Sequence, residues 1–408
     1  MKALLTILSV AALATPAHAY LNARALALSG SLSSWQGGVD AVHLNPASAY
    51  RAGARRQFEL AGVSARAVNN AFTVRDYNRY SGAYLSEDDK TYLLDQVPES
   101  GLTLSATAGV QAASLWASPV AVTIWSEGVV EGTLSKDAVE LLLYGNATMD
   151  TVILTGTQAE SYLTASMGFT YAFPALRVAG GTLAAGATLR YVKGLWVEEV
   201  TESHGELITA TTQIDADAHL LARTANGGRG VAADVGFLLD HGSGWNFGLS
   251  ATNLLGSVRW DGNPEAYAVR FTVDSVSLLN ANDDLVQSHD TTYAIAAFTT
   301  RLPTTLRLGA SRSWQRFSLL GQWEQGVGNG TGSSTHPRLS GGAEWFLSRA
   351  IPLRTGLALG GGGGVSGTLG SGFYAGVFYL DFAVGLASGA VWGDAKGLAL
   401  AMNTGFRF

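Results

Sequence analysis

The sequence predicts an all-β fold, a transmembrane antiparallel β-barrel of about fourteen strands with short helical insertions. Three observations lead to this prediction. Apolar residues recur at every second position in many segments, the N-terminus has the pattern of an export signal, and only 14% of the 408 residues are charged. A soluble domain carries about 25% charged residues. This chain therefore has too few charged side chains to cover its outer surface in the way that a soluble protein does.

The alternation is clearest in the segment 163–173. It places Leu163, Ala165, Met167, Phe169, Tyr171 and Phe173 on one face and Thr164, Ser166, Gly168 and Thr170 on the other. A strand with one apolar and one polar face produces this pattern. The segments 231–239 and 245–252 repeat it, and it continues to the end of the chain, where Phe406 and Phe408 share a face. Roughly fourteen such segments follow one another, with room for some long loops.

The first residues indicate export. Met1 and Lys2 precede an apolar run from Ala3 to Ala14, and small residues follow at Ala17 and Ala19. This is the pattern of a secretory signal peptide over residues 1–19, with cleavage between Ala19 and Tyr20. The apolar run is too short for a membrane anchor, which needs roughly 20 residues.

Alternation alone also fits a soluble β-sandwich, so the choice of a membrane barrel depends on further features. The signal peptide places the chain beyond the inner membrane. The last strand, with Phe406 and Phe408, resembles the assembly signal that the barrel-assembly machinery recognises in outer-membrane barrels. Large aromatic residues near strand ends would form girdles at the two lipid interfaces; they are Trp116, Trp125, Trp196, Trp245, Trp314, Trp323, Trp345 and Trp392. We therefore expect the outer membrane of a Gram-negative-type bacterium, with its lipid as a partner.

Two segments break the strand pattern and predict helices. Ser86 begins a capping box that continues to Val97 before Pro98, and a second helical segment runs from Ser135 to Leu143.

Charged residues on the non-lipid faces of strands are expected to line the lumen. They are Arg190, Asp234, Arg307, Glu324, Glu344, Arg354, Asp381 and Arg407. Because both signs are present, a simple cation or anion filter is excluded. Two interpretations remain open, namely ion pairs that hold the barrel interior and residues that guide a ligand.

No linear motif indicates catalysis, a cofactor or a metal. The chain has no Cys, and its formal net charge of −6 argues against nucleic acid as a partner. Asp215, Asp217 and His219 share a strand face, but metal sites usually recruit ligands from several elements. His241 and Ser243 are a suggestive pair in a Gly-rich turn, although a triad is recognised by geometry rather than by sequence. We therefore expect that the protein is not an enzyme.

Both ends of the chain resemble the FadL family (FadL/TodX type) of outer-membrane transporters for hydrophobic compounds. The similar segments are Arg24 to Gly30, Gly38 to Ala47, Gly342 to Phe346, Leu353 to Gly356 and Leu380 to Ala383. The resemblance implies a fourteen-stranded barrel over residues 55–408 and an N-terminal hatch over residues 20–54 inside its lumen. It also implies passage of a hydrophobic small molecule from the lumen through the barrel wall into the bilayer.

Within the expected hatch, Asp40 and Asn45 offer polar anchors to the barrel wall, and Pro46 limits regular structure. Alternatives remain open for the function. The same family scaffold serves as a barrel subunit in protein secretion or outer-membrane structure, and barrel hydrolases assemble active sites from separate strands. A poorly characterised subgroup shares the segments 76–78 and 86–90.

Overall fold

The structure is a computed structural model of the chain. It describes residues 22–53, 55–146, 151–178, 180–210, 212–276, 285–328 and 334–408. The expected cleavage site between Ala19 and Tyr20 lies outside these residues. Among the described residues, no helix is both long enough and apolar enough to cross a membrane.

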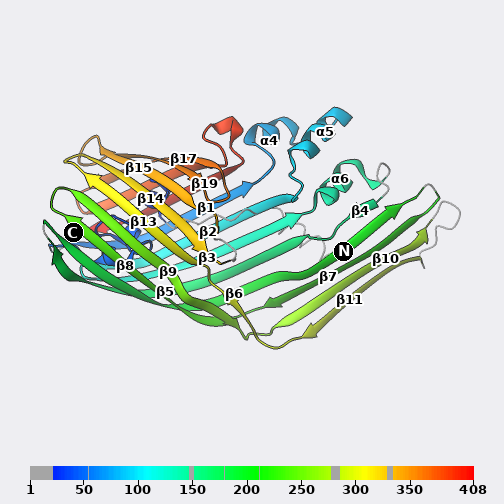
Figure 1. Cartoon of the computed structure of the whole chain (residues 1–408), viewed down its shortest axis with the longest axis horizontal. Helices are drawn as coiled ribbons and strands as arrows, with labels where there is room; N and C mark the ends of the chain where they lie inside the picture. The colour runs from blue at the N-terminus through cyan, green and yellow to red at the C-terminus, as the bar shows by residue number, and fades with distance from the viewer. Residues whose placement is uncertain are drawn as a thin grey trace.

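Fourteen strands close into an antiparallel barrel because the last strand, β19, pairs with the first, β1 (Figure 1). This confirms the predicted fold class. The barrel strands in order are β1 (Arg56–Asn69), β2 (Leu102–Ala117), β3 (Val120–Leu134), β5 (Gln158–Val178), β6 (Gly181–Thr209), β8 (Gly228–His241), β9 (Trp245–Trp260), β13 (Thr304–Ser313), β14 (Phe317–Val327), β15 (Arg338–Phe346), β16 (Pro352–Gly360), β17 (Val365–Ala375), β18 (Phe378–Ala387) and β19 (Gly397–Arg407).

The period-two pattern separates an outer from an inner face. In β5, Met167, Phe169 and Tyr171 are about half exposed, whereas Thr170 between them is fully buried. In β19, Leu400 and Met402 face outward, while Asn403 is buried. The barrel therefore carries its apolar side chains on the outside, which is the reverse of a soluble protein and is expected of a surface in contact with lipid.

The two ends of the barrel differ. At one end, which we call the short-turn end, strands are joined by tight connections such as Ser118–Pro119 and Gly242–Gly244. At the other, the long-loop end, the connections contain the helices α4 (Val74–Tyr80), α5 (Glu87–Gln96) and α6 (Lys136–Tyr144). The short helix η4 (Trp392–Asp394) also lies in a connection at this end.

Both predicted helices are confirmed. α5 begins after Ser86, whose side chain forms a capping box with Asp89, and α6 begins after Ser135. α4 was not predicted, although its own capping box between Thr73 and Asp76 could have been found in the sequence.

Five further strands lie outside the closed barrel, namely β4 (Thr151–Ile153), β7 (Ile214–Ala225), β10 (Glu265–Val276), β11 (Val286–Ala294) and β12 (Phe298–Arg301). β6 runs on beyond the barrel, so its first half pairs with β8 and its second half with β7. β10 pairs with β7, and β11 pairs with β10. These strands build a sheet that projects from the long-loop end, which we call the β extension (Figure 1).

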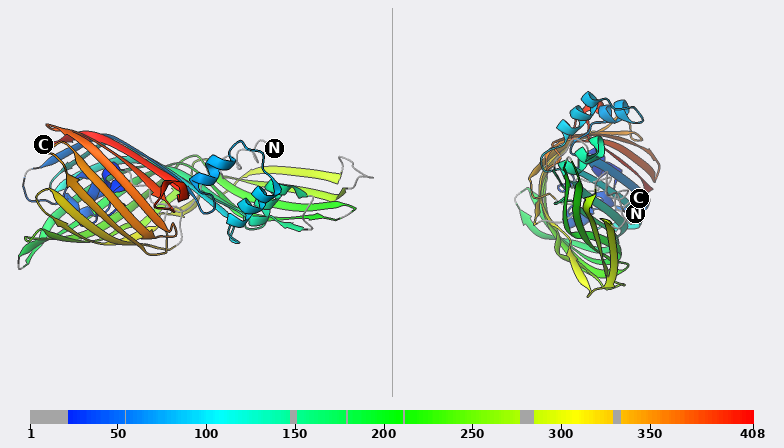
Figure 2. Two further views of the ribbon diagram at one scale, coloured as in Figure 1. Left: turned by 90° about the horizontal axis from the view of Figure 1, so that it is seen from above. Right: turned by 90° about the vertical axis from the view of Figure 1, so that its right-hand side faces the viewer.

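The segment 22–53 lies inside the barrel, except for Ala52 and Gly53 at its end, which are exposed (Figure 2). It contains α2 (Ala23–Ala27), α3 (Val39–Val42) and the 3₁₀ helix η1 (Pro46–Ala49), all of whose residues are buried. α2 contacts β16 to β19, and η1 contacts β5, β6 and β8 on another side of the barrel. We call this segment the hatch.

The predicted aromatic girdle is wrong for two tryptophans. Trp116 and Trp125 are buried inside the barrel, whereas Trp245, Trp314 and Trp345 are exposed as expected. The hatch explains the difference, because it supplies partners that lipid cannot. The Trp116 indole N–H donates to the Ala49 carbonyl at 2.8 Å, and the Trp125 ring makes an edge contact with His43.

Candidate functional site

Buried charges connect the hatch to one side of the barrel. Glu344 of β15 accepts from Arg24 of α2 at 2.7 Å and from Arg354 of β16 at 2.6 Å. Arg354 also donates to Asp381 of β18 at 2.6 Å. None of these four side chains is more than 8% exposed. Guanidiniums and carboxylates therefore satisfy one another in the interior, where an unpaired charge would be very costly.

The predicted anchor Asp40 extends this set of charges. Its carboxylate lies 3.6 Å from Arg24 and 3.9 Å from Arg407 of β19, and the Asn22 and Gln57 amides are at 3.4 Å. Arg407 in turn lies 3.7 Å from Asp381. We call this set the anchoring network; its members are Arg24, Asp40, Glu344, Arg354, Asp381 and Arg407.

Glycines let this side of the wall approach the hatch closely. A Cβ atom at Gly356 would lie 2.7 Å from the backbone of Leu28 and Ser29, and one at Gly370 would lie 2.5 Å from the Ala27 side chain. Backbone atoms cannot move aside for such a side chain, so any residue larger than glycine would push the hatch and the wall apart.

The other two predicted hatch residues bind a different part of the wall. The Asn45 amide donates to the carbonyls of Ser33 and Phe237 at 2.7 and 3.0 Å, and its oxygen caps η1 by accepting from the Ala47 N–H. Pro46 is the first residue of η1 and packs against Gly186 of β6. Asn45 thus links two parts of the hatch to each other and also links the hatch to β8.

Two further ion pairs involve predicted lumen residues. Arg190 of β6 donates to Asp234 of β8 at 2.9 Å, and Arg307 of β13 donates to Glu324 of β14 at 2.6 Å. All eight predicted lumen residues therefore take part in ion pairs, and only the Arg407 side chain is as much as one third exposed. That any of these residues guides a ligand stays a prediction.

A cavity of about 170 Å³, which we call the lumenal pocket, lies between the hatch and the strands β3, β5, β6, β8 and β9. His43 and Leu44 of the hatch line it, together with wall residues Thr123, Trp125, Glu127, Arg190, Asp234 and Asn253. Arg190 stands over the Trp125 ring at 5.6 Å from its centroid and also contacts the Asn253 side-chain oxygen. Its Nε atom is buried and has no hydrogen-bond partner among the described residues. The pocket therefore combines apolar side chains such as Leu44, Trp125 and Leu302 with a largely polar lining. Two of its polar groups, Arg190 Nε and the Thr107 hydroxyl, have no hydrogen-bond partner among the described residues.

His43 belongs to the hatch and not to a membrane-spanning strand. Burial, and then the nearby Arg190, lower the pKa of His43 to about 4, while Asp40 acts in the opposite direction. The imidazole is therefore neutral at neutral pH, and the Gln111 amide lies 2.9 Å from its Nε2.

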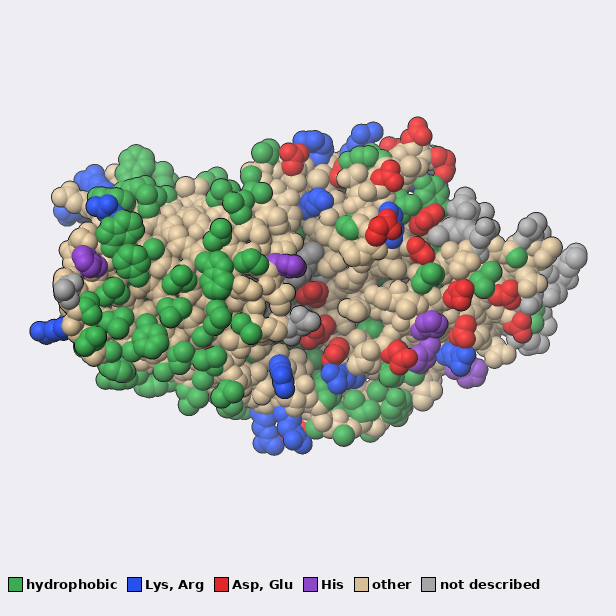
Figure 3. Space-filling model, in the orientation of Figure 1, with side chains coloured by type: hydrophobic (Ala, Val, Ile, Leu, Met, Phe, Trp, Pro, Cys, Tyr) green, Lys and Arg blue, Asp and Glu red, His purple; other side chains and the backbone are tan. Residues whose placement is uncertain are grey.

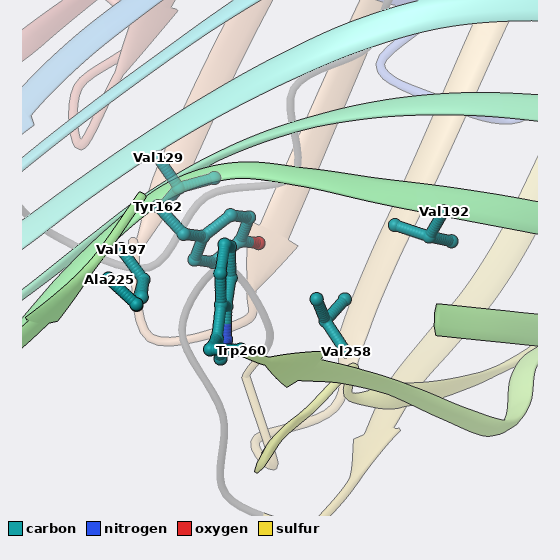
Figure 4. Packing of buried hydrophobic residues seen from close by; sticks show 7 residues of the cluster. All are labelled: Val129, Tyr162, Val192, Val197, Ala225, Val258 and Trp260. Carbon is teal, nitrogen blue, oxygen red and sulfur yellow. The ribbon is translucent and has the colours of Figure 1, made fainter. Parts of the chain in front are cut away.

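An apolar cluster covers the pocket toward the long-loop end. Its members are Val129, Tyr162, Val192, Val197, Ala225, Val258 and Trp260, with Phe298 and Leu302 packed against them. The Tyr162 and Trp260 side chains lie next to each other in its middle (Figure 4). Val129, Tyr162, Val192 and Leu302 also line the pocket. The cluster therefore separates the pocket from the β extension.

The barrel wall is interrupted next to the pocket. β9 pairs with β13 up to Thr252 and with β12 from Ser257, so the regular ladder is interrupted between these points. The Gly256 carbonyl accepts from the Leu302 N–H at 3.0 Å, and the Asn253 amide donates to the Pro303 carbonyl at 2.9 Å. The pairing of β9 with β8 also shifts register in this region. Asn253 and Leu255 have φ values of 59° and 56°, and the Leu255 side chain is 92% exposed on the outside. A left-handed conformation is costly for leucine and is found mainly where the surrounding structure enforces it.

We call this interruption the wall break, formed by residues 253–256 of β9 and by Leu302 and Pro303. Thr252, Asn253, Leu302 and Pro303 line the lumenal pocket as well. The wall break was not predicted. The signal was available, because the apolar residues of this strand occupy odd positions up to Ala251 and even positions from Leu254 to Trp260, with Leu255 as an extra apolar residue where the alternation changes phase.

The remaining sequence motifs make only local contacts with neighbouring residues or strands. Asp217 of β7 pairs with Arg270 of β10 at 2.9 Å in the β extension. Within the described ranges, no group of three or more His, Asp or Glu side chains is arranged to hold a metal ion. Ser243 lies 2.6 Å from His241 Nδ1, but both residues occupy an exposed turn.

Comparisons with known proteins identify the fold. Residues 206–380 match a family of unknown function (DUF5723), and no curated protein matches the chain. Among solved structures, a TodX monoaromatic hydrocarbon channel deltaS2 mutant is similar with a TM-score of 0.54 and 13% identity, over 95% of this chain and 97% of that one. The toluene transporter TodX of P. putida has a TM-score of 0.50 and 11% identity, over 95% and 96% of the two chains. The predicted resemblance to FadL-type barrels is thereby confirmed for the fold.

Proposed function

We propose that this protein is an outer-membrane channel through which small hydrophobic molecules pass by way of the lumenal pocket and the wall break. The observation that carries the proposal is that the two features share residues. Thr252, Asn253, Leu302 and Pro303 belong to the interrupted stretch of wall and also line the pocket. A molecule in the pocket is thus separated from the outer surface by a stretch of wall where the regular ladder is interrupted, with the bond from the Leu302 N–H to the Gly256 carbonyl crossing it.

The size of the pocket supports a ligand of about one ring. Its volume is about 170 Å³, and an engineered cavity of about 150 Å³ in another protein binds benzene. The similar solved structures are described as transporters or channels for toluene and monoaromatic hydrocarbons, which agrees with a ligand of this size.

The hatch supports a sideways path rather than a straight one. The anchoring network and the close glycine contacts hold α2 against β15 to β19, so a straight path along the barrel axis would require these contacts to break. A path through the wall break leaves them in place. In this proposal the hatch serves as the floor of the pocket and keeps its seat during transport.

A disulfide across the wall break tests the path. The natural chain has no Cys. A Cβ atom at Gly256 would lie 3.0 Å from the Leu302 Cβ, so cysteines at these two positions would be close enough to be joined after a small adjustment. We expect the oxidised G256C/L302C variant to lose toluene entry into cells that express it, and a reductant to restore entry.

The matched control is L249C/L308C. These residues are paired directly between β9 and β13 where the ladder is intact. The control disulfide should leave toluene entry unchanged. Normal entry through a fully oxidised G256C/L302C variant would rule out the path through the wall break. If the natural protein admits no more toluene than an empty vector, the transport function itself fails, and a role in secretion or outer-membrane structure becomes the better proposal.

A further inference from the structure

Charge is distributed unequally between the two ends of the molecule. Acidic side chains gather over the long-loop end and the β extension, as the right-hand half of Figure 3 shows. At the short-turn end, a cavity of about 860 Å³ is instead lined by six arginines and two carboxylates. The arginines are Arg24, Arg51, Arg55, Arg56, Arg316 and Arg407, and the carboxylates are Asp240 and Glu344. We call this cavity the basic vestibule.

Four of the arginines lack a carboxylate partner. Arg24 and Arg407 belong to the anchoring network, which also occupies Glu344. Among the residues that the structure describes, no carboxylate oxygen lies within ion-pair distance of Arg51, Arg55, Arg56 or Arg316. Burial, and then the nearby Arg55 and Arg24, lower the pKa of Arg51, while Asp240 acts in the opposite direction. The vestibule therefore has an excess of positive charge that an anion would neutralise.

Aromatic side chains complete the lining. Trp35 lies under the Arg24 guanidinium at 4.1 Å, Trp116 packs against Gly37, and Trp314 is at the rim. Flat apolar surfaces next to guanidiniums suit an organic anion with an aromatic body, because the ring packs on the indoles while the carboxylate accepts paired hydrogen bonds from arginine.

We propose that the basic vestibule is a binding site for a small aromatic carboxylate. Its volume falls within the range of roughly 300–1,000 Å³ that small-molecule sites occupy. It is lined by turns of the barrel and by the hatch, and Arg55, Arg56 and Arg316 are exposed, so a small solute can reach it from the short-turn end. The site is separate from the lumenal pocket, since no residue lines both cavities.

The position of the site gives the anion contact with both parts of the molecule. Arg51 and Trp35 belong to the hatch, whereas Arg316 lies in the turn between β13 and β14. A carboxylate held by Arg51 and Arg316 bridges the hatch and the wall. The ligand therefore stabilises the seated hatch from the short-turn end.

Equilibrium binding to the full-length protein in an uncharged detergent tests the proposal. Benzoate is the probe, and benzyl alcohol is its neutral counterpart of similar shape. Isothermal titration should show that the natural protein binds benzoate in preference to benzyl alcohol. The R51Q/R316Q variant should bind benzoate about tenfold more weakly or worse, which corresponds to about 1.4 kcal/mol.

The matched control is R177Q/R349Q, which removes the same charge from two exposed arginines outside the vestibule. Its benzoate affinity should stay within roughly twofold of that of the natural protein. This is expected if binding depends on direct contact with the arginines and not on the long-range electrostatic field at this end of the barrel. Heat-modifiable gel mobility shows whether each variant is folded, and R56Q/R316Q replaces the first variant if the change at Arg51 disturbs the hatch.

Three outcomes would overturn the proposal. Benzoate and benzyl alcohol could bind equally well, both double variants could lose benzoate affinity equally, or hexa-aspartate could bind while benzoate does not. The last result would identify an acidic protein segment as the partner. None of these measurements involves toluene entry, so this proposal and the transport proposal can fail separately.

Discussion

The barrel wall differs on two sides of the hatch. From β14 to β19 the ladder runs without a register shift, glycines bring the wall against α2, and buried ion pairs cross from wall to hatch. From β8 to β13 the register shifts and two residues other than glycine have left-handed backbone. Gly236 and Gly248 of this wall also approach the hatch closely, but among the described residues no ion pair joins this wall to the hatch, and a pocket lies next to the contact. We call the first the anchoring wall and the second the pocket wall.

This difference shows how a barrel whose lumen is occupied by the hatch can still leave room for a small molecule. Ion pairs concentrated on one side anchor the hatch. On the other side neutral hydrogen bonds and close glycine contacts hold it, and a cavity lies there next to an interrupted stretch of ladder. If neither wall were anchored, the hatch would not define a pocket.

The largest expected effect comes from removing the centre of the anchoring network. Glu344→Gln removes the carboxylate that both Arg24 and Arg354 bind, leaving Arg24 with Asp40 at 3.6 Å and Arg354 with Asp381. Because two buried charge-assisted hydrogen bonds are lost, we expect a loss of about 3–5 kcal/mol in the free energy of unfolding. Asp234→Asn makes the matched change in the pocket wall. Arg190 keeps its contact with Asn253 and faces a cavity there, so we expect a loss of only about 1–3 kcal/mol. Urea unfolding in detergent, followed by tryptophan fluorescence, measures both; equal losses would remove the distinction between the walls.

A smaller effect is expected from adding one methyl group where the anchoring wall meets the hatch. Gly356→Ala places a Cβ atom against the backbone of Leu28 and Ser29, and we expect a loss of about 1–3 kcal/mol. Gly321→Ala is the control, because the atom nearest to its Cβ, the Ser340 carbonyl oxygen, would be 4.0 Å away. The same unfolding assay should show little change for the control. A tolerated Gly356→Ala would mean that the hatch is not tightly seated.

The smallest expected effect is a change of stability with pH that arises from His43, a hatch residue next to the lumenal pocket. Because burial lowers the pKa of His43 to about 4, the unfolded chain takes up a proton near pH 6.5 and the folded protein does not. The stability contribution is therefore present above pH 6.5 and is lost as the pH falls toward 4, by about 1–2 kcal/mol at pH 5. His43→Gln keeps an amide next to Gln111 but cannot titrate, so its stability should change less between pH 7 and pH 5. Identical pH profiles would show that His43 is hydrated through the pocket.

Several features of this fold could be read from local patterns. The strands around Met167 and Leu400 were predicted with the correct apolar faces, and the capping box at Ser86 predicted α5. These succeed because period-two alternation and helix capping depend on neighbouring residues alone. The inward position of Trp116 and Trp125 was missed because proximity to a strand end does not reveal which face of the strand a ring occupies.

The sequence by itself determined that strands with one apolar face make up most of the chain and that charged residues of both signs share the opposite face. Only the tertiary structure decided which of those charges meet, since Arg24 and Glu344 are 320 positions apart and are brought together by closure of the barrel around the hatch. The tertiary structure also decided where the pocket lies. The wall break depends on the register between β8, β9 and β13, and register is a property of paired strands, which no single segment contains.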